Sequence, residues 1–440
     1  MTLSLSSASL AMAALMLSAP LAMASNFGCS GQEFNPALPS IEGKDGYFYR
    51  VFADLRLQHE MTDPVIERLG ALSDALAAQG TTLVYVTVPT KSQAMSQYLP
   101  DHAAEYGFDI AIATKVYQNI ITRLTARGVT APDLQTAMSK SDDAHPVFFQ
   151  ADFHWTSDGA RLAAEAIGAA IRATPAFADL TPEEYTSTPA KETAAFSGMR
   201  RALQGFCTDE LPRVETMAYV TAKAEETLDL GTDIFASDAE RPEIALVGTS
   251  FSDSTVNNFA GFISQYSGLD LVNYAITGGN QFGSITSYMT SRAFQEARPQ
   301  YLIWENPIYN GLVQYGFDPL DELIAAAGDT CTQVLPATKA DANTVTADLK
   351  DITLQPGDLI LADFGKDESR NAQFSFATDS GVVRTATMAR ADRLAPTGRF
   401  FQTVSAIWRP DFTKVDVRFD RAVTDETTLT LCTTAKKDAS

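Results

Sequence analysis

Residues 243–250 read Glu-Ile-Ala-Leu-Val-Gly-Thr-Ser, a short apolar run that ends in a small polar turn. Similar runs follow at 269–276 and 301–305, with helical or loop sequence between them. Short apolar strands that alternate with helices indicate an α/β protein with a parallel sheet. Ser250 follows its strand directly, so we expect it at the carboxyl edge of that sheet, where α/β proteins hold their sites. The alternative is an ordinary helix cap, because Ser and Thr cap helices commonly.

The chain before this run predicts two long helices and a further strand. Residues 64–79 have apolar side chains at helical spacing, and a second helical stretch at 109–127 stops at Gly128. Residues 82–88 are β-branched and aromatic, which is typical of a strand. A third, Ala-rich helix is predicted at 159–173, with Ser157 or Asp158 as its cap. Residues 175–240 are less regular.

One of the four histidines has the surroundings of a general base. The other three lie in polar stretches or turns that are typical of the surface: His59, His102 and His145. His154 stands two residues after Asp152 and directly before the predicted Ala-rich helix. A general base needs a second group that fixes its tautomer, and an Asp at this offset can be that group. We therefore predict that Ser250, His154 and Asp152 form a catalytic triad.

The last hundred residues predict a separate β-sandwich. Short, turn-separated β-rich runs recur there, at 358–364, 372–377, 381–388, 400–408, 414–419 and 427–432. Residues 336–440 carry 14 Lys and Arg against 15 Asp and Glu, so −20 of the net charge of −21 lies in the first 335 residues. This change places a domain boundary near residue 335. The predicted division is 25–335 for the α/β domain and 336–440 for the sandwich.

Residues 1–24 predict export. They are apolar and small, and they end in Ala22-Met23-Ala24, the cleavage pattern of a secretory signal peptide. No later apolar run is long enough to span a membrane, so the mature protein is expected to be soluble. The acidic balance excludes nucleic acid as a partner, because a phosphate backbone needs clustered Lys and Arg.

The four cysteines fit an oxidising compartment. Four cysteines permit three disulfide connectivities. Pairing within each predicted unit would give Cys29–Cys207 and Cys331–Cys432, while the alternative is buried free thiols.

Two of these segments together resemble a known family. Residues 152–156, Asp-Phe-His-Trp-Thr, and 248–250, Gly-Thr-Ser, are similar to the SGNH hydrolase-like domain of the alginate O-acetyltransferases of the AlgX and AlgJ type. Ordinary SGNH hydrolases place the serine early and the histidine near the end, whereas here the histidine comes first, as in the circularly permuted alginate group. The resemblance covers roughly residues 40–330, and the β-rich tail is similar to the carbohydrate-binding module of the AlgX type.

The resemblance implies roles for individual residues. Ser250 would carry acetyl as an ester, with His154 as base and then acid and Asp152 orienting it. The backbone N–H groups of Ser250 and of Gly278 or Gly279 would form the oxyanion hole, with Asn306 at the position of a third donor. The sequence Trp-Glu-Asn-Pro at 304–307 departs from the usual G-x-N-D block of SGNH proteins. No cofactor or metal is expected, since the acetyl donor would come from partner proteins of an acetylation and export machinery in the periplasm.

The C-terminal unit is predicted to bind a polyanion. Guanidinium groups bind carboxylates in pairs of hydrogen bonds, and aromatic faces stack on sugar rings. The alternative is a solvated sandwich face in which aromatic residues such as Trp408 belong to the core. The predicted polysaccharide-binding residues are Lys366, Arg384, Arg390, Arg399, Trp408 and Arg409.

The expected function is a periplasmic O-acetyltransferase that acts on hydroxyls of an anionic exopolysaccharide, the mannuronate residues of alginate. One alternative is a carbohydrate esterase or deacetylase that uses the same residues with water as acceptor. A second is a non-catalytic polysaccharide-binding scaffold of an export machine.

Overall fold

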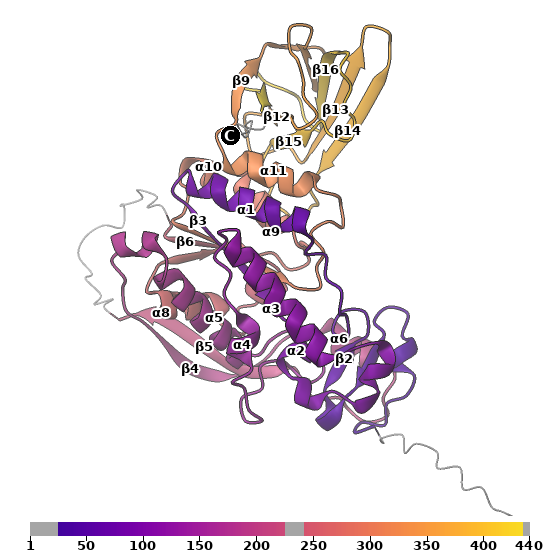
Figure 1. The fold of residues 1–440 in the computed structure, drawn as a ribbon, viewed down its shortest axis with the longest axis vertical. Coiled ribbons are helices and arrows are strands. Elements are labelled where there is room, and N and C mark those ends of the chain that lie inside the picture. The colour runs from indigo at the N-terminus through magenta and orange to yellow at the C-terminus, as the bar shows by residue number, and fades with distance from the viewer. Residues whose placement is uncertain (1–24, 225–241, 434–440) are drawn as a thin grey trace, which may run out of the picture.

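The protein is described by a computed structural model that covers residues 25–224 and 242–433. The predicted signal peptide at 1–24 lies outside the described residues. Figure 1 shows an α/β body in the middle, a small layer near the start of the described chain, and a β-sandwich formed by the C-terminal residues. Within the described residues, no helix is long and apolar enough to cross a membrane.

The centre of the body is a parallel sheet with the strand order β3-β8-β6-β7. All three strand pairings are parallel, which confirms the predicted sheet. The predicted strands at 82–88 and 243–247 are present. The strand predicted at 269–276 is shorter, although the N–H groups of Tyr274 and Ile276 still donate to the carbonyls of Leu246 and Gly248. The strands are β3 (Thr82–Val88), β6 (Ile244–Val247), β7 (Leu271–Asn273) and β8 (Tyr301–Pro307).

Helices cover both faces of this sheet, because alternate residues of each buried strand point to opposite sides. Val84 and Leu246 pack into one apolar core, and Leu83 and Ala245 into the other. The first face is covered mainly by α4 (Leu134–Met138), α5 (Ser157–Arg172) and α8 (Phe259–Ser267), with the short α2 (Lys91–Ala94) nearby. The second is covered mainly by α1 (Asp63–Ala77), α3 (Ile110–Ala126), α9 (Gly283–Met289), α10 (Arg292–Glu296) and α11 (Asp318–Ala327).

The three predicted helices are present, with one correction at a helix start. Helix α5 is capped by Thr156, whose side chain accepts the N–H of Gly159, and not by Ser157 or Asp158. The cap therefore lies only two residues after His154.

The region at 175–240, where the sequence pattern is less regular, contains regular elements in its described part, which ends at residue 224. It contains a two-stranded antiparallel ribbon, β4 (Tyr185–Ala194) with β5 (Glu215–Lys223), and the helix α6 (Gly198–Gln204) between them. Most β4 residues are exposed or half-buried, so this strand lacks the apolar alternation that marks a strand in sequence.

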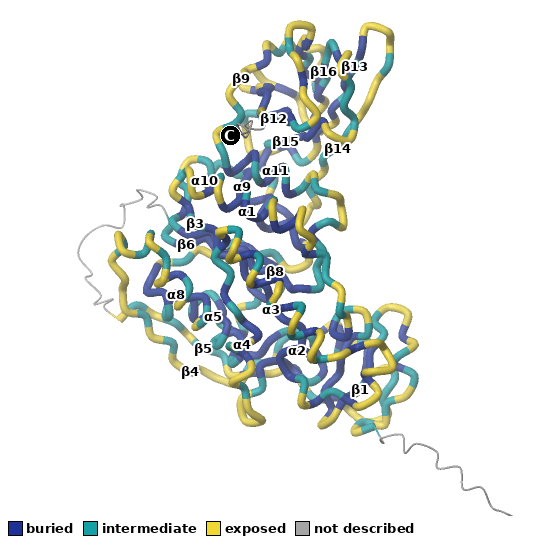
Figure 2. The backbone as a smooth tube through the Cα atoms, in the orientation of Figure 1, coloured by how far each residue is buried: buried dark blue, intermediate teal, exposed yellow. Residues whose placement is uncertain are grey.

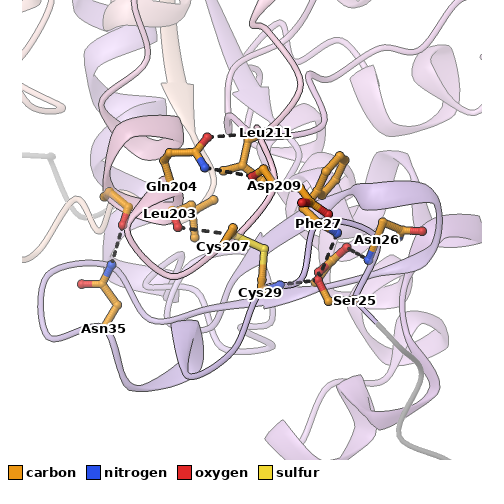
Figure 3. Close-up of a disulfide and its surroundings, with 12 residues drawn as sticks. Ser25, Asn26, Phe27, Cys29, Asn35, Leu203, Gln204, Cys207, Asp209 and Leu211 are labelled. Atoms are coloured by element: carbon orange, nitrogen blue, oxygen red, sulfur yellow. Dashed lines mark hydrogen bonds between the residues drawn. A yellow bond between two sulfur atoms is a disulfide. The ribbon is translucent and has the colours of Figure 1, made fainter.

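A small layer joins the start of the described chain to α6. It contains the antiparallel pair β1 (Ser40–Glu42) and β2 (Phe48–Arg50). Its apolar core combines Phe48 of β2, Ala151 beside the predicted triad, and Met199 and Leu203 of α6. The disulfide Cys29–Cys207 links this segment to the end of α6, as Figure 3 shows.

The C-terminal residues form the predicted sandwich of two antiparallel sheets. One sheet has the order β10-β11-β16-β13-β14 and the other β15-β12-β17-β9. Its core consists of large apolar side chains from both sheets. The strands are β9 (Cys331–Leu335), β10 (Ala337–Lys339), β11 (Thr344–Asp348), β12 (Leu359–Asp363), β13 (Asn371–Thr378), β14 (Val383–Ala389), β15 (Arg399–Thr403), β16 (Phe412–Phe419) and β17 (Thr428–Cys432).

The sandwich begins slightly before the predicted boundary at residue 336. Strand β9 pairs with β17, and the disulfide Cys331–Cys432 joins these two strands. Both disulfides therefore have the pairing within each unit that the sequence suggested.

The sandwich packs directly on the α/β body through α11. Leu359, Phe401 and Cys432 of the sandwich are buried in the same apolar cluster as the helices around α11. Figure 2 shows buried segments both in the body and in the sandwich. The two domains therefore share one core at their junction.

Candidate active site

Two segments that are distant in the sequence meet at the carboxyl end of β6. Ser250 is the first residue of the short helix α7 (Ser250–Asp253), directly after β6 and its turn. Asp152 and His154 lie in the loop before α5. The fully buried Trp155 joins the two segments, because its indole N–H donates to the carbonyl of Phe251 over 3.0 Å.

The three predicted triad side chains form a continuous chain of hydrogen bonds. His154 Nδ1 lies 2.6 Å from Asp152 Oδ1, and His154 Nε2 lies 2.7 Å from Ser250 Oγ. The backbone N–H of His154 also donates to Asp152 Oδ1, over 2.8 Å. With its Nδ1 proton held by the carboxylate, the imidazole has Nε2 available to accept the proton of the serine hydroxyl. The geometry suits an activated serine nucleophile.

The second oxygen of Asp152 has a partner that the sequence analysis missed. Ser197 Oγ donates to Asp152 Oδ2 over 2.5 Å, and the carboxyl group is buried with 1% of the residue exposed. Burial alone raises the pKa of the Asp152 carboxyl, but the hydrogen bonds from His154 and Ser197 outweigh it and hold the pKa below its usual range. Asp152 is therefore ionised at neutral pH. The available sequence signal was a serine at a helix start, since Ser197 also caps α6.

A buried lysine forms hydrogen bonds near the loop that carries Asp152. Lys91 follows β3, and its ammonium donates to the carbonyls of Phe48 and Gln150 over 2.8 and 3.0 Å. It thereby links β2 to the segment just before Asp152. Burial lowers the pKa of Lys91 to about 7, against the attraction of nearby carboxylates that include Asp152.

The four predicted oxyanion donors differ in how they are engaged. Ser250 begins α7, so its N–H has no acceptor within the helix. The N–H of Gly278 donates to no protein group within residues 25–224 and 242–433. The N–H of Gly279 donates to the carbonyl of Ile276, over 3.1 Å.

Asn306 is buried near the end of β8, and its amide already donates to other groups. Its amide nitrogen donates to Tyr85 Oη over 3.0 Å and lies 3.4 Å from the carbonyl of Asn310. Of the four donors, Ser250 and Gly278 are thus the two whose N–H groups are not already taken.

The sandwich reaches the Gly278 turn through an arginine. Arg393 Nη1 donates to the carbonyl of Thr277 over 3.3 Å, and a Cβ on Gly278 would lie 2.0 Å from this nitrogen. Gly278 has a φ of 72°, which also favours glycine. Thr277 in turn donates its N–H to Asp253 of α7, over 2.8 Å. The turn beside the nucleophile is therefore in contact with the C-terminal domain.

The predicted polysaccharide-binding residues are engaged in different ways and do not form one free cluster. Arg384 and Lys366 are exposed. Arg399 pairs with Asp363 over 2.8 Å, and Arg409 with Asp411 over 2.8 Å. The half-buried Trp408 packs against the sandwich core, and its indole N–H donates to the carbonyl of Leu354. This agrees with the alternative that Trp408 belongs to the core.

Arg390 is the one predicted glycan residue that lies between the domains. Its guanidinium pairs with Glu322 of α11 over 2.5 Å, and both side chains are largely buried. Arg390 also lines a cavity of about 400 Å³ between α9, α11 and the sandwich, with Tyr315, Gln402 and other residues.

The parallel sheet, with a serine after one of its inner strands and a His–Asp pair beside it, is the architecture of an SGNH hydrolase-like protein. The match is more specific than this class. Residues 41–308 fit the family model described as "SGNH hydrolase-like domain, acetyltransferase AlgX", so the chain belongs to that family.

Curated relatives carry names from alginate biosynthesis. The chain is 30% identical over 283 residues to "Alginate biosynthesis protein AlgX" of Pseudomonas aeruginosa, which covers 63% of this chain and 57% of that protein. It is 28% identical over 313 residues to "Probable alginate O-acetylase AlgJ" of the same organism, which covers 67% of this chain and 78% of that protein. The match to the AlgX protein therefore spans little more than half of its length.

Solved structures agree on the fold. Pseudomonas aeruginosa AlgX superimposes with a TM-score of 0.74 at 22% identity, covering 93% of this chain and 98% of that one. The O-acetyltransferase domain of Pseudomonas putida AlgJ gives a TM-score of 0.52 at 23% identity, covering 65% of this chain and 98% of that one. The AlgX match therefore includes both the α/β body and the sandwich.

Proposed function

We propose that this chain is an exported O-acetyltransferase that transfers acetyl through an ester on Ser250 to hydroxyls of an anionic exopolysaccharide of the alginate type. The observation that carries the proposal is the position of His154 between Ser250 and Asp152, with one ring nitrogen at hydrogen-bond distance from each. Family membership supports the reaction class, and the names of the curated relatives support the polymer.

In the first half-reaction Ser250 Oγ attacks the acetyl carbonyl of the donor while its proton moves to His154 Nε2. The bond to the donor's leaving oxygen breaks, and that oxygen takes the proton from His154. In the second half-reaction a sugar hydroxyl attacks the serine ester and gives its proton to His154, which returns it to Ser250 Oγ. Asp152 stays ionised and stabilises the imidazolium in both steps.

The negative charge that develops on the carbonyl oxygen needs donors. We assign the N–H groups of Ser250 and Gly278 to this role, because the N–H of Gly279 and the amide of Asn306 already bind other acceptors. One such donor typically lowers the barrier by about 3 kcal/mol. Arg393 beside Gly278 adds positive charge at the same turn.

Location and partners follow from the same proposal. Two disulfides are expected in an oxidising compartment, which fits the periplasm. The acetyl donor would come from other proteins of an acetylation and export machinery. The exposed Arg384 and Lys366, together with the cavity at Arg390, would contact the carboxylates of the polymer.

The test is acetyl transfer from an activated ester, p-nitrophenyl acetate, to oligomannuronate. We expect Ser250→Ala to abolish acetylated oligomer and to lose the acetyl adduct seen by intact mass. Ser254→Ala removes a hydroxyl from the residue directly after α7 and is the matched control, which should keep both signals. Unimpaired transfer by Ser250→Ala would contradict the assignment.

Product analysis separates the two alternatives. Free acetate without acetylated oligomer would identify an esterase, since water would then be the acceptor. If a fluorophosphonate probe leaves Ser250 unlabelled while the protein binds oligomannuronate, the chain is a binding scaffold instead.

A further inference from the structure

A buried carboxylate contacts the turn that carries Ser250, and it has no role in the proposed acetyl transfer. Glu305 is in β8, next to β6, and it is fully buried. It belongs to the Trp-Glu-Asn-Pro segment that departs from the SGNH pattern. Burying a carboxylate is costly unless its oxygens are hydrogen-bonded, so its contacts indicate what it does.

The hydrogen bonds to the Glu305 carboxylate come from Thr249 and Ser252, which lie on either side of Ser250 in the sequence. The N–H of Thr249 donates to Oε2 over 2.7 Å, and the hydroxyl of Ser252 donates to the same oxygen over 2.9 Å. The Thr249 hydroxyl lies 3.1 and 3.0 Å from the two carboxylate oxygens. Glu305 therefore holds the backbone before Ser250 and the side chain after it.

The turn is shaped to fit this carboxylate. A Cβ on Gly248 would lie 2.5 Å from Glu305 Oε2, so a larger residue there would push the carboxylate away. Other contacts hold the ends of the turn: the Gly248 N–H donates to Ser284 Oγ over 3.1 Å, and Asn273 donates to the Ser252 carbonyl over 2.8 Å. Among the described residues, Glu305 is the side chain that bonds to both flanks of Ser250.

We propose that Glu305 is a positioning residue that fixes the turn at 248–252 so that Ser250 Oγ points at His154 Nε2. The inference rests on the proposed role of Ser250 as the nucleophile. Burial raises the pKa of Glu305 to about 7, but a carboxyl group accepts the Thr249 N–H in either protonation state. Glu305 needs no charge for this role, only an oxygen at that place.

Position matters here because the hydroxyl and the imidazole form a single hydrogen bond. A misplacement of about 1 Å at a reacting atom can cost roughly 100-fold in rate. Loss of the carboxyl group should therefore lower the rate of Ser250 acylation and leave the binding of donor and polymer largely unchanged.

The experiment compares Glu305→Leu, Glu305→Gln and the control Leu302→Ala. Gln keeps an oxygen for the Thr249 N–H, Leu removes it, and Leu302 is a fully buried residue of the same strand that packs away from the turn. The readouts are the acylation rate of Ser250 with p-nitrophenyl acetate, kcat and KM for transfer, thermal unfolding, and deuterium exchange of a peptide spanning 246–253.

For Glu305→Leu we expect kcat and acylation to fall by about 100-fold with KM nearly unchanged, and exchange at 246–253 to become faster. Glu305→Gln should keep most of the rate and the wild-type exchange. Leu302→Ala should unfold at a lower temperature but keep kcat.

Equal loss of kcat in Leu302→Ala and Glu305→Leu would overturn the proposal, because the effect would then be general destabilisation. Loss in Glu305→Gln as large as in Glu305→Leu would also overturn it. If the wild-type protein is not acylated at all, the proposed function fails, and the exchange measurement still decides the positioning role: unchanged exchange in Glu305→Leu overturns it.

Discussion

At the residue scale, contacts with several side chains fix the position of His154. Its two ring nitrogens face Asp152 and Ser250, and its ring packs against Phe153 and Phe251. The aromatic neighbours restrict the ring, while the carboxylate fixes its tautomer. Asp152 is fixed in turn by Ser197, so the chain of hydrogen bonds has four members.

Ser197 is predicted to contribute to rate through Asp152. In Ser197→Gly the hydrogen bond to Asp152 is lost, whereas Gly still caps α6 at a cost of a few tenths of a kcal/mol. A hydrogen bond to a charged group is worth about 1.5–3 kcal/mol, so kcat should fall by about tenfold or more. Ser197→Thr keeps the hydroxyl and should keep the rate. The measurement is kcat together with thermal unfolding, and equal rates for the two variants would contradict the role.

Glu305 predicts a pH dependence of stability. Its pKa is raised from 4.5 to about 7 in the folded chain, so between these values the folded state binds a proton that the unfolded state releases. Its contribution to stability is therefore present below pH 4.5 and is lost as the pH rises through about 7, by roughly 3 kcal/mol in all. Gln does not titrate, so Glu305→Gln should not lose this stability as the pH rises.

We expect the unfolding temperature of Glu305→Gln, relative to the wild type, to rise between pH 5 and pH 8. Thermal unfolding of both proteins across this range measures it. A difference that does not change with pH would show that Glu305 titrates normally.

At the scale of elements, α6 connects the predicted triad to a disulfide. Ser197 caps α6, and Cys207 follows the helix and is bonded to Cys29. Around this bond the side chain of Gln204 bonds to the Asp209 carbonyl and the Leu211 N–H, and Asn35 bonds to the carbonyl of Ala202 (Figure 3). The segment that holds Ser197 is thus tied to the N-terminal layer.

Removal of this disulfide should affect both stability and activity. Cys29→Ala with Cys207→Ala is expected to cost about 2–5 kcal/mol of stability and to lower kcat, because α6 would be less firmly held. Cys331→Ala with Cys432→Ala is the matched control. It opens a loop of similar order, 101 against 178 residues, but lies in the sandwich, so it should cost stability and keep kcat. Equal kcat in both double variants would contradict this prediction, because the hold on α6 would then have no effect on activity.

Elements with a clear apolar period were predictable, and those without one were not. α1 and α3 have an apolar face because they pack on the sheet, and β3 is rich in apolar and β-branched residues because it belongs to the buried sheet. The ribbon of β4 and β5 lies on the surface, where polar residues satisfy its backbone without an apolar pattern. Ser197 was missed for the same reason, since it lies between these two strands.

At the scale of the whole molecule, the junction of the two domains gives one of the predicted polysaccharide-binding residues a structural role. Arg390 was expected to bind polysaccharide, but its guanidinium neutralises Glu322 of α11 at a buried interface, where Glu322 is 3% exposed. Arg390 therefore has a structural role in addition to lining the cavity.

Arg390→Met is predicted to destabilise the protein, because it leaves a buried carboxylate without its partner. Breaking a buried ion pair from one side costs about 3–5 kcal/mol. Arg384→Ala is the contrasting variant, since Arg384 is exposed on β14 and its loss should weaken binding of oligomannuronate with little change in stability. Thermal unfolding and glycan binding of both variants measure this. A wild-type unfolding temperature in Arg390→Met would show that the pair contributes nothing.

The chain alone was enough to predict the parallel sheet, the sandwich and the disulfide pairs. It also indicated Asp152, His154 and Ser250 as candidate residues, and their side chains lie within hydrogen-bond distance of one another in the order Asp152, His154, Ser250. Each of these depends on local patterns: apolar period, turn residues, cysteine placement and a short motif. Folding in three dimensions decided the rest. It placed Ser197 against Asp152 and Glu305 against Thr249. It also engaged Gly279 and Asn306 with other acceptors and placed Arg390 against Glu322. The contacts of Ser197, Glu305 and Arg390 join residues far apart in the sequence, and local patterns carry no information about them.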